Sequence, residues 1–371
     1  METALVVGGG IGGMATAISL CERGLVVQLV DIDPDWRVYG AGITITGPTL
    51  RAYRRLGMLD AIKSSGAITN KARLLRFDGT HIRDLDEPVI EEGLPATGGI
   101  MRPVLHRIMQ SRVRELGIPV RLGLTVTALE QAGPKVNVTY SDGSTGSYDL
   151  VVGADSVFSG LRELAFPHMA PAVPTGQGCW RISIRRPPTL EMGEFYLGHD
   201  NPCGITICGP DAIYMWMLTP HQSREQHFTD EELFVTLKAQ LADFGGHAGW
   251  IRDNMTPEDW INYRPLAAAL QPRPWSNGRI VLVGDAVHAT TPHLASGAGM
   301  AVESGIVLAE ELARADSVAA GLAAYEERRF ERCRDVIETS VSLGQLQLNH
   351  GSPQRFAELL EGALGRLNEP F

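Results

Sequence analysis

The sequence predicts an α/β fold, in which a Rossmann-like dinucleotide-binding domain is interrupted by an antiparallel sheet and followed by a helical C-terminal region. Three observations support this. A glycine-rich turn joins a buried strand to a helix at the start of the chain. Short β-type segments separated by turn residues fill the middle, and the pattern after residue 321 is helical and charged. We therefore expect one dinucleotide fold with a sheet-rich insertion.

The composition is typical of a large globular chain. Its 371 residues are 44% hydrophobic and 20% charged, which is enough apolar material for a substantial core. The formal net charge of −10 excludes a nucleic-acid partner, which would need a basic footprint, and gives no attraction to an anionic membrane surface. No apolar run reaches the roughly 18 residues of a membrane helix. Monomer and homodimer both stay open.

Five scattered cysteines indicate a reducing compartment. They are odd in number and never spaced as C-x-x-C, so neither a disulfide framework nor a zinc site is predicted. The ten histidines show no metal-ligand spacing, and we expect no metal. The first residues begin an apolar strand at once, without the basic region of a signal peptide, so we expect a cytoplasmic protein.

The opening segment reads as strand, glycine turn, helix, strand. ALVVGG is a buried strand, GGMATAISLCERG has helical spacing, and VVQLVDID is a second strand. Gly8, Gly10 and Gly13 have the G-x-G-x-x-G spacing that lets a pyrophosphate approach a helix N-terminus. Asp31 follows Gly13 by 18 residues, at the tip of the second strand, where a carboxylate binds ribose hydroxyls. These residues predict a dinucleotide, which is either NAD or FAD.

Further helices, hairpins and a strand are expected between residues 49 and 155. The segment 49–62 is amphipathic and predicts a surface helix, and LLRFDGTHIRDLD (74–86) has a DG turn between two strands. PVLHRIMQSRVREL (103–116) has proline in its first turn and predicts a helix. A second hairpin, 135–149, leads into a buried strand that ends at Asp155.

The middle of the chain predicts an antiparallel sheet that holds the substrate. Tyr214 and Trp216 are two residues apart in a strand and so share one face, and Arg181 lies in another strand. Such a face suits a flat aromatic, with the arginine meeting a phenolate or carboxylate. The alternative is that Trp216 is core and Arg181 forms a surface salt bridge. Thr44 and Thr46 share a face of an earlier strand and are further candidates for contact with ligand.

A strand near residue 280 ends in Asp285, which precedes two histidines, a proline and small residues. An aspartate at the end of a buried strand is costly unless a polar partner is present. A helix is expected from Gly299 to Ala313. Sequence signatures of serine hydrolases, zinc proteases and P-loop proteins are absent.

Five segments resemble the flavoprotein aromatic hydroxylases of the para-hydroxybenzoate hydroxylase type, also called class A FAD monooxygenases. Besides the glycine turn, these are Arg37 with YGAGITITGPTLRAYRRLGMLDAI, Arg102 in MRPVLHRIM, DLVVGADSVFSGLR, and VLVGDAVHATTPHLASGAG. They cover about the first 165 residues and 279–304, in the family's order. The resemblance implies a Rossmann-like FAD-binding domain of the glutathione-reductase type.

The resemblance also implies which residues contact FAD. Asp285 would meet the ribityl and pyrophosphate part, and the helix opened by residues 297–299 would point its positive end at the flavin ring. The complete expected set is Gly8, Gly10, Ile11, Gly12, Gly13, Asp31, Arg37, Gly42, Ile43, Arg102, Val126, Asp155, Asp285, Gly297, Ala298 and Gly299.

The implied reaction is hydroxylation of a small aromatic or N-heteroaromatic substrate. NAD(P)H would act as a transient reductant, and O2 would form a flavin hydroperoxide that transfers oxygen. Pro292 would bound the reactive face, while His288 would be structural. The expected catalytic residues are His293, Pro292, Tyr214 and Arg181, and the expected substrate contacts are Thr44, Thr46, Arg181, Tyr214, Trp216 and His293.

Three serines depart from the family pattern. Ser156 replaces the glycine of the D-G motif, Ser296 stands where glutamine is common, and Ser304 stands where an aspartate often follows the glutamate. Two alternative functions therefore stay open. One is a flavin oxidoreductase of this fold that inserts no oxygen, and the other is a non-catalytic FAD or ligand sensor.

The predicted partition of the chain is discontinuous. The FAD-binding domain comprises residues 1–70, 98–165 and 275–320. The substrate-binding sheet domain comprises 71–97 and 166–274, and the C-terminal helices occupy 321–371.

Overall fold

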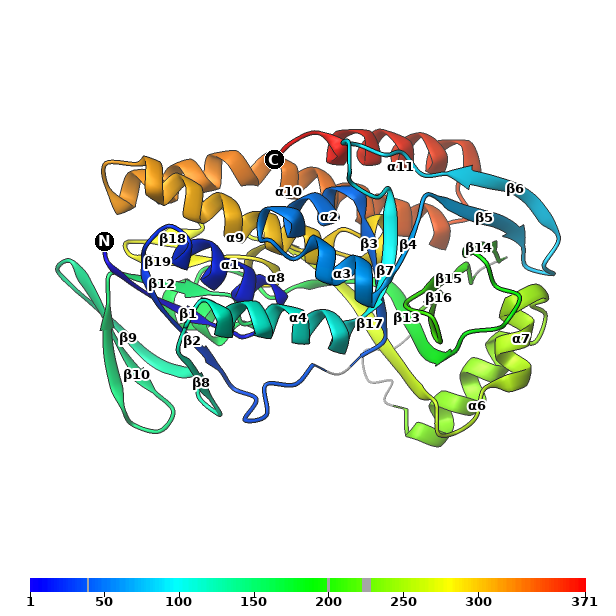
Figure 1. The fold of residues 1–371 in the computed structure, drawn as a ribbon, viewed down its shortest axis with the longest axis horizontal. Coiled ribbons are helices and arrows are strands. Elements are labelled where there is room, and N and C mark those ends of the chain that lie inside the picture. Colours follow the sequence, from blue (N-terminus) through cyan, green and yellow to red (C-terminus); the bar gives the residue numbers. More distant parts are fainter. Residues whose placement is uncertain (39, 199–200, 222–227) are drawn as a thin grey trace.

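A six-stranded sheet forms the core of one half of the molecule (Figure 1). The computed structural model describes residues 1–38, 40–198, 201–221 and 228–371, so Tyr39 of the family-like segment lies outside the described residues. All strand pairs in this sheet are parallel except the first. From edge to edge the strands are β18 (Ser276–Asn277), β19 (Ile280–Leu282), β12 (Leu150–Gly153), β1 (Thr3–Val7), β2 (Val26–Asp31) and β8 (Val120–Leu122).

Helices cover this parallel sheet because its central strands are apolar on both faces. All four residues of β12 and the last four of β1 are buried. Helix α1 (Ile11–Cys21) packs closely against α9 (Gly297–Arg314) and also contacts α4 (Arg102–Glu115). This continuous burial of strands and helices is typical of a parallel α/β domain.

A seven-stranded sheet forms the other half. The strand order is β17 (Trp260–Leu270), β13 (Val173–Arg185), β16 (Ala212–Pro220), β15 (Cys203–Ile207), β14 (Gly193–Leu197), β5 (Lys71–Arg76) and β6 (His81–Asp86). All pairs are antiparallel except β14 with β5. Helices α6 (Asp230–Gln240) and α7 (Gly246–Asn254) pack on one face through a separate apolar core. These two helices do not cover the opposite face of the seven-stranded sheet, and β3 contacts β15 and β16 of this sheet.

Two smaller sheets complete the strands. One sheet contains β3 (Gly42–Thr46), β7 (Thr97–Met101) and β4 (Ala67–Thr69), and both β3 and β7 also contact β15 of the large sheet. The second sheet contains β9 (Val126–Ala132), β10 (Lys135–Tyr140) and β11 (Thr145–Tyr148), the projecting hairpin region in Figure 1. The first of these small sheets therefore connects the two halves.

The C-terminal helices extend over both halves (Figure 1). Helix α10 (Val318–Leu348) contacts α9 in the half with the parallel sheet, and β13 and β17 in the large sheet. It is followed by α11 (Pro353–Asn368). The short elements α5 (Gly160–Ala165), α8 (Asp285–His288) and η1 (Pro292–Leu294) lie in the loops that follow strands.

The predicted single surface helix over 49–62 is wrong in two respects. The chain forms α2 (Gly47–Arg55) and α3 (Leu59–Ser65), because Gly57 takes a positive φ of 72° and ends the first helix. Helix α2 is also largely buried. Arg51 is only 5% exposed and donates to the main-chain oxygens of Asn368 and Glu369, at 2.8 and 2.5 Å.

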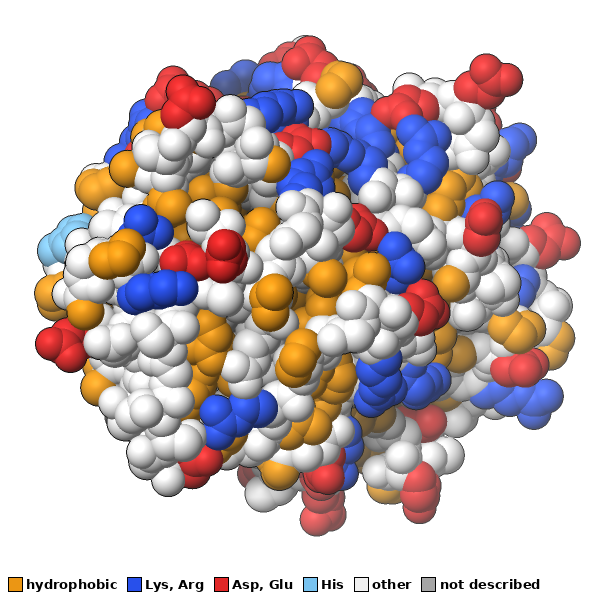
Figure 2. Space-filling view, turned by 60° about the vertical axis from the view of Figure 1, so that its left-hand side comes forward, with side chains coloured by type: hydrophobic (Ala, Val, Ile, Leu, Met, Phe, Trp, Pro, Cys, Tyr) orange, Lys and Arg blue, Asp and Glu red, His pale blue; other side chains and the backbone are white. Residues whose placement is uncertain are grey.

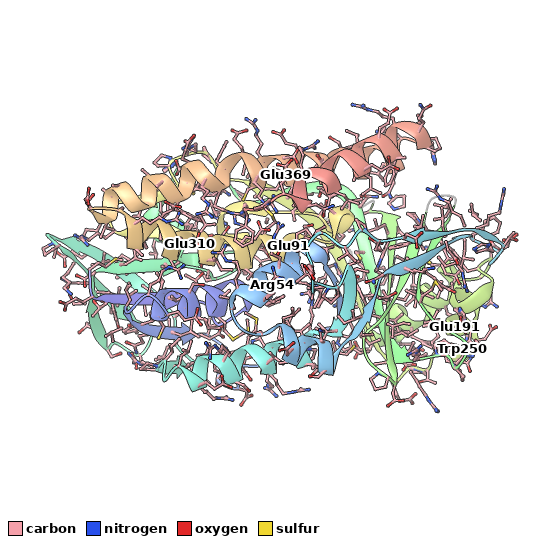
Figure 3. The ribbon with its side chains drawn as sticks, turned by 45° about the horizontal axis from the view of Figure 1, so that its top comes forward. Arg54, Glu91, Glu191, Trp250, Glu310 and Glu369 are labelled. Carbon is pink, nitrogen blue, oxygen red and sulfur yellow. The ribbon has the colours of Figure 1, made fainter. Side chains whose placement is uncertain are left out.

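The surface of the molecule is mixed in charge. Figure 2 shows basic and acidic side chains interspersed over the upper part of one face. Many belong to ion pairs, such as Arg55 with Glu310. Another pair joins Arg54 and Glu91, which lie close together in Figure 3. Within the described ranges, no helix is both long enough and apolar enough to span a bilayer. Nor do three or more His, Cys, Asp or Glu side chains gather there as a metal site requires.

Candidate functional site

The glycine-rich turn is packed too tightly for side chains on its inner side and is open on its outer side. A Cβ at Gly8 would lie 2.4 Å from the carbonyl oxygen of Ala154, and one at Gly13 would lie 1.8 Å from the Gly8 oxygen. A Cβ at Gly10, the residue that caps α1, would meet nothing within 4 Å. The turn therefore presents the N-terminus of α1 to open space, as binding of a pyrophosphate requires.

Asp31, at the tip of β2, is tied to the same turn. Its Oδ2 accepts from the amide of Gly9 at 2.5 Å, and its Oδ1 accepts from the amide of Asp33 at 2.7 Å. Each oxygen retains a second lone pair. The carboxylate is thus held at the edge of the turn and can still accept hydrogen bonds from ribose hydroxyls.

Asp285 and Arg102 have the properties of side chains that line a recess, here called the cleft. Both side chains are accessible to water, yet both are desolvated by surrounding protein. Burial raises the pKa of the Asp285 carboxyl, opposed by the nearby Arg102. Burial also lowers the pKa of Arg102, and the cation of Arg181 lowers it further. Among the described residues, neither the Asp285 carboxylate nor the Arg102 guanidinium has a hydrogen bond or a salt bridge to protein, although the main-chain amide of Arg102 donates to the carbonyl of Ala41 at 3.1 Å. These two side chains are therefore polar groups without protein partners.

The N-terminus of α9 borders the region after Asp285. Gly299 needs its lack of a side chain, because a Cβ there would lie 2.2 Å from Oγ1 of Thr49 on α2. Gly297 and Ala298 are partly accessible. Their amides belong to the first turn of an 18-residue helix, where amides lack partners within the helix. This end carries positive dipole, which suits an electron-rich ring.

The segment around Asp155 holds the loop that contains Asp285. Asp155 accepts from Ser159 Oγ at 2.5 Å and from the amide of Leu161 at 3.0 Å. The buried Arg162 donates to the carbonyl oxygen of Ala286 at 2.8 Å, which joins the two family-like motifs directly. Ser156, which replaces a glycine, has a φ of 75°. Its backbone therefore lies in the left-handed region where glycine is favoured.

A buried polar network supports the Asp285 loop from behind. His288 Nε2 lies 2.8 Å from Ser304 Oγ, and Arg329 on α10 donates to that same oxygen at 3.2 Å. Arg329 also pairs with the buried Glu303 at 2.7 Å and donates to the carbonyl of Met300 at 3.2 Å. Burial, with the Arg329 cation, lowers the pKa of His288 to about 3. His288 is therefore neutral and structural.

Arg181, Tyr214 and Trp216 share the face of the large sheet opposite α6 and α7. The register places Arg181 opposite Trp216 on β16 and opposite Asn262 on β17. Tyr214 is two residues from Trp216 on the same face and interacts with Arg181. Gly42 of β3 packs on this face, because a Cβ there would lie 2.6 Å from Cβ of Tyr214. Electrostatic interactions among Arg102, Arg181 and Tyr214 place this face beside the cleft.

The two threonines of β3 differ in their contacts. Thr44 Oγ1 is 2.9 Å from Thr206 Oγ1 of β15, so Thr44 meets the large sheet on the same side as Gly42. Thr46 Oγ1 is 3.1 Å from Thr49 Oγ1, which in turn lies against Gly299. Thr44 thus lies at the junction of the halves, and Thr46 lies beside the start of α9.

His293 is held by protein on both sides of its ring. Its Nδ1 is 2.9 Å from Thr291 Oγ1, and its Nε2 is 3.2 Å from Gln347 Oε1 on α10. Both ring nitrogens are therefore engaged by protein, and burial lowers the pKa of the ring to about 4. The family-like loop suggested a ligand contact, whereas the side chain turns toward α10. The adjacent Pro292 is exposed.

The remaining predicted cofactor residues lie around the parallel sheet or at its junction with β3. Arg37 is exposed and pairs with Asp35. Val126 is buried at the start of β9, and the neighbouring Leu124 donates to the carbonyl of Asp31 at 3.0 Å. Ile11 and Gly12 follow Gly10 in α1, and Ile43 lies in β3 between Gly42 and Thr44. The segment with Val126 therefore passes close to the tip of β2.

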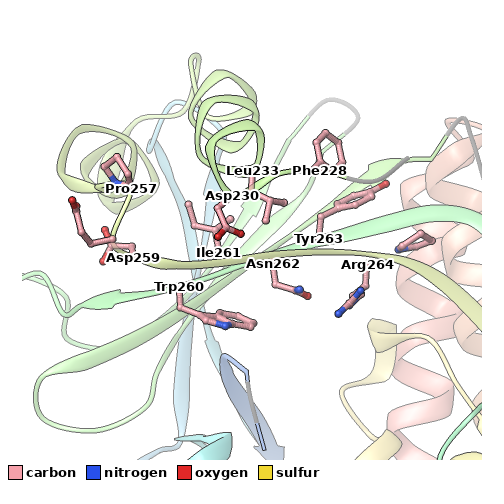
Figure 4. A pocket seen from close by; sticks show the side chains of 12 residues that line it. Phe228, Asp230, Leu233, Pro257, Asp259, Trp260, Ile261, Asn262, Tyr263 and Arg264 are labelled. Carbon is pink, nitrogen blue, oxygen red and sulfur yellow. The ribbon is translucent and has the colours of Figure 1, made fainter. Parts of the chain in front are cut away.

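A separate hollow of about 580 Å³ lies beside β17 (Figure 4). No residue of the glycine turn lines it. Asn262 and Arg264 point to one side of the strand, whereas Ile261 and Tyr263 point to the other (Figure 4). Three carboxylates, Asp230, Glu258 and Asp259, contribute to its lining. It does not contain Asp285, Arg102 or Arg181 and so is distinct from the cleft.

Sequence reasoning missed Trp36, His106 and Arg329. Trp36 Nε1 donates to the carbonyl oxygen of Gly9 at 2.9 Å, and His106 Nε2 lies 3.2 Å from the same oxygen. The one available signal was Gly9 itself, an extra glycine inside GGGIGG that the fingerprint does not require. Arg329 gave no signal, because an arginine in a charged helix is ordinarily solvated.

Comparison with known proteins is consistent with this geometry. Residues 1–340 match a family model described as FAD binding domain. YetM of Bacillus subtilis (strain 168), which has been assigned as an FAD-dependent monooxygenase, is 30% identical over 95% of both chains. The FAD-dependent urate hydroxylase of Klebsiella pneumoniae is 25% identical over 96% of this chain and 92% of its own.

Solved structures share the fold. The crystal structure of Klebsiella pneumoniae HpxO complexed with FAD and uric acid superposes with a TM-score of 0.84, at 22% identity, over 100% of this chain and 93% of that one. The structure of PqsL of P. aeruginosa in complex with 2-aminobenzoylacetate gives a TM-score of 0.83 at 19% identity. The match covers 97% of this chain and 99% of that one. At these identities the likeness concerns architecture alone.

The fold and the comparisons together define a flavoprotein oxidoreductase. The chain belongs to the FAD-binding-domain family, and it is an FAD-dependent monooxygenase of the class A type. The residues present fit FAD, because Gly10 leaves room for a pyrophosphate and Asp285 lacks a protein partner among the described residues. Glycine turn, Asp31, Asp285 and the start of α9 would hold it.

Proposed function

We propose that this enzyme hydroxylates a small planar aromatic or N-heteroaromatic substrate that carries a negative charge, such as a phenolate or carboxylate. NAD(P)H is the proposed reductant and O2 the co-substrate. When bound, reduced FAD supplies the electrons that activate O2. The chain's own residues bind and orient the substrate and exclude water from the cleft.

The observation that carries this proposal is the uncompensated positive charge of the cleft. The pKa of Arg181 is raised, because the effects of Cys179 and Tyr214 outweigh its burial, so Arg181 stays charged. Burial and then the cation of Arg181 lower the pKa of Arg102, which has no salt bridge among the described residues. An anionic ligand relieves this cost, and a planar guanidinium binds a carboxylate or phenolate well. The Asp285 carboxylate acts on Arg102, but burial disfavours its charged form.

Aromatic shape complements this charge. Trp216 lies opposite Arg181 on the sheet face, with Gly204 beside it, where a Cβ would lie 2.6 Å from the indole. Tyr214 offers a phenol whose pKa is raised by burial, so its hydroxyl is a proton donor at neutral pH. We assign Arg181 to the anionic group, Tyr214 to a substrate oxygen, and Trp216 to the ring face. Pro292 bounds the opposite side.

The relatives agree with the proposed substrate class. One is named as a urate hydroxylase, and another, 29% identical over 93% of this chain, is the 2-heptyl-3-hydroxy-4(1H)-quinolone synthase of Pseudomonas aeruginosa. The two names give a purine and a quinolone, which are both flat N-heterocycles. The proposal extends that class to this chain.

A panel of matched aromatic acids and their neutral amides tests the proposal. With purified FAD-loaded protein, hydroxy- and carboxy-substituted pyridines, quinolines and benzenes should stimulate NADH or NADPH oxidation, and the product mass should rise by one oxygen. Arg181→Gln should raise KM for an acid substrate by about 10- to 100-fold and leave its FAD content unchanged. A preference for the neutral amides, or unchanged kinetics in Arg181→Gln, contradicts the proposal.

A further inference from the structure

The carbonyl group of Gly9 has two side-chain partners that the FAD-binding fingerprint does not require. Trp36 Nε1 donates to it at 2.9 Å, and His106 Nε2 lies 3.2 Å from it. Both side chains are nearly excluded from solvent, at 4% and 5% exposed. The amide of Gly9 is also fixed, because it donates to Asp31. The peptide groups on both sides of Gly9 are therefore held in one orientation.

Trp36 takes an unusual conformation in order to make this contact. Its φ is 48°, in the left-handed region that is unfavourable for a large side chain. Gln110 Nε2 donates to its carbonyl at 2.7 Å, and the guanidinium of Arg114 lies 5.5 Å from the ring centre. His106 meets the ring edge-on at 6.0 Å. A strained residue held by several contacts is a reason to look for a function.

The consequence for the next amide follows from peptide geometry. The Gly9–Gly10 peptide is trans, so the Gly9 carbonyl and the Gly10 N–H point in opposite directions. When Trp36 and His106 hold the carbonyl, the Gly10 N–H points away from them. Among the described residues it has no acceptor, and Gly10 is exposed at the N-terminus of α1. This amide is therefore aimed at the open side of the turn.

We propose that Trp36 and His106 are positioning residues for the pyrophosphate of FAD, which act by locking the Gly9–Gly10 peptide so that the Gly10 N–H donates to a phosphate oxygen. Preorganisation of this donor removes the cost of orienting it when the ligand binds. The pairing also explains the extra glycine, since a Cβ at Gly9 would lie 2.4 Å from Trp36 Nε1. This inference concerns FAD binding and does not depend on the proposed substrate.

The affinity of the deflavinated full-length chain for FAD and for ADP tests the inference. Trp36→Phe replaces the indole by a smaller aromatic ring without the N–H donor, so both dissociation constants should rise about tenfold. ADP shares the pyrophosphate but lacks the flavin, and an equal effect on both ligands locates the loss at the pyrophosphate. His106→Leu should also weaken both ligands, whereas His106→Gln, which retains an N–H donor, should restore most of the affinity.

Trp180→Phe is the matched control. Trp180 is equally buried and donates through Nε1 to Thr219 at 3.1 Å, but it lies in the large sheet. That variant should lose stability without losing affinity for FAD or ADP. The inference is overturned if Trp36→Phe and His106→Leu both bind FAD within twofold of wild type, or if Trp180→Phe weakens binding as much as Trp36→Phe.

Discussion

At the scale of single residues, Asp285 is a group placed for a ligand at a cost to the empty protein. It is desolvated in the cleft and has no hydrogen-bond partner among the described residues. Arg102 opposes this cost only in part, through its positive charge. A side chain of this kind is selected for binding and not for stability.

Asp285→Ala should therefore separate binding from folding. We expect FAD affinity to fall by about 10- to 100-fold, as for loss of a charge-assisted hydrogen bond, while the apoprotein melts at an equal or higher temperature. Asp285→Asn, which keeps the shape, should be intermediate. Fluorescence titration with FAD and thermal melts of the apoproteins measure the two effects. A fully flavinated Asp285→Ala protein refutes this assignment.

Ser156 carries backbone strain at a position where the related motif has glycine. Its φ of 75° costs about 1 kcal/mol in a residue with a Cβ, so Ser156→Gly should stabilise the protein by up to about that amount. Ser159→Gly is the control, because Ser159 has an ordinary φ of −52° and caps α5 by accepting from Arg162. That control should destabilise. Urea unfolding measures the free energy of unfolding of both variants. A lower value for Ser156→Gly than for the wild type would show that the serine side chain makes a compensating contribution.

At the scale of elements, the Asp285 loop, α9 and α10 are joined by the buried network around Ser304. His288 has its pKa depressed to about 3 by burial and by the cation of Arg329, against about 6.5 in an unfolded chain. Between about pH 3 and about pH 6.5, His288 binds a proton in the unfolded chain but not in the folded chain. The stability that neutral His288 contributes is therefore fully present above about pH 6.5 and is lost as the pH falls.

The network therefore predicts a specific pH dependence. Between pH 7 and pH 5 the wild type should lose about 2 kcal/mol of unfolding free energy through His288 alone. His288→Gln, which can still bond to Ser304, should be less stable at pH 7 but should lose about 2 kcal/mol less over that interval. Urea unfolding at the two pH values, with FAD in constant excess, measures this. Equal losses in both proteins would mean that His288 titrates normally.

Sequence patterns predicted the elements that depend on local signals. The turn from Gly8 to Gly13, the hairpin of β5 and β6, and the face shared by Tyr214 and Trp216 all follow from spacing. The division of the predicted 49–62 helix at Gly57 was missed, because the sequence alone does not show that a single glycine has a positive φ. The carbonyl of Gly9 is bound by Trp36 and His106, which lie 27 and 97 positions later in the sequence. No local sequence pattern predicts such contacts.

Pairings over long distances were equally hidden. The hairpin β5–β6 joins the large sheet through a parallel pairing of β5 with β14, more than a hundred residues later. The protein partner of His293 was hidden for a related reason. Its position after Pro292 suggested a ligand contact, whereas its partner, Gln347, belongs to a helix whose docking only the tertiary fold defines.

At the scale of the whole molecule, α10 holds the two halves together. Gln347 Oε1 accepts from Gln177 of β13 at 3.0 Å and lies 3.2 Å from His293, while Gln345 donates to the carbonyl of Thr175 at 3.0 Å. The same helix carries Arg329 into the network behind Asp285. The orientation of the sheet face toward the FAD side therefore depends on this helix.

We expect the two halves to unfold in one transition. Because α10 packs against both, loss of its packing exposes both cores together. In urea, far-UV circular dichroism, tryptophan fluorescence and release of FAD should show coincident midpoints. Flavin release that clearly precedes the loss of secondary structure at saturating FAD, followed by a second transition, would show that the halves fold independently.

In the proposed function, the enzyme transfers one atom of O2 to an anionic aromatic substrate that is bound between FAD and the sheet face. Turnover under ¹⁸O2 in ordinary water, with product mass spectrometry, tests this most directly. The account predicts one ¹⁸O in the product for each NAD(P)H oxidised in coupled turnover, and no label when ¹⁸O is supplied only in water. A product that takes its oxygen from water, or oxidation without a gain of oxygen, contradicts the account.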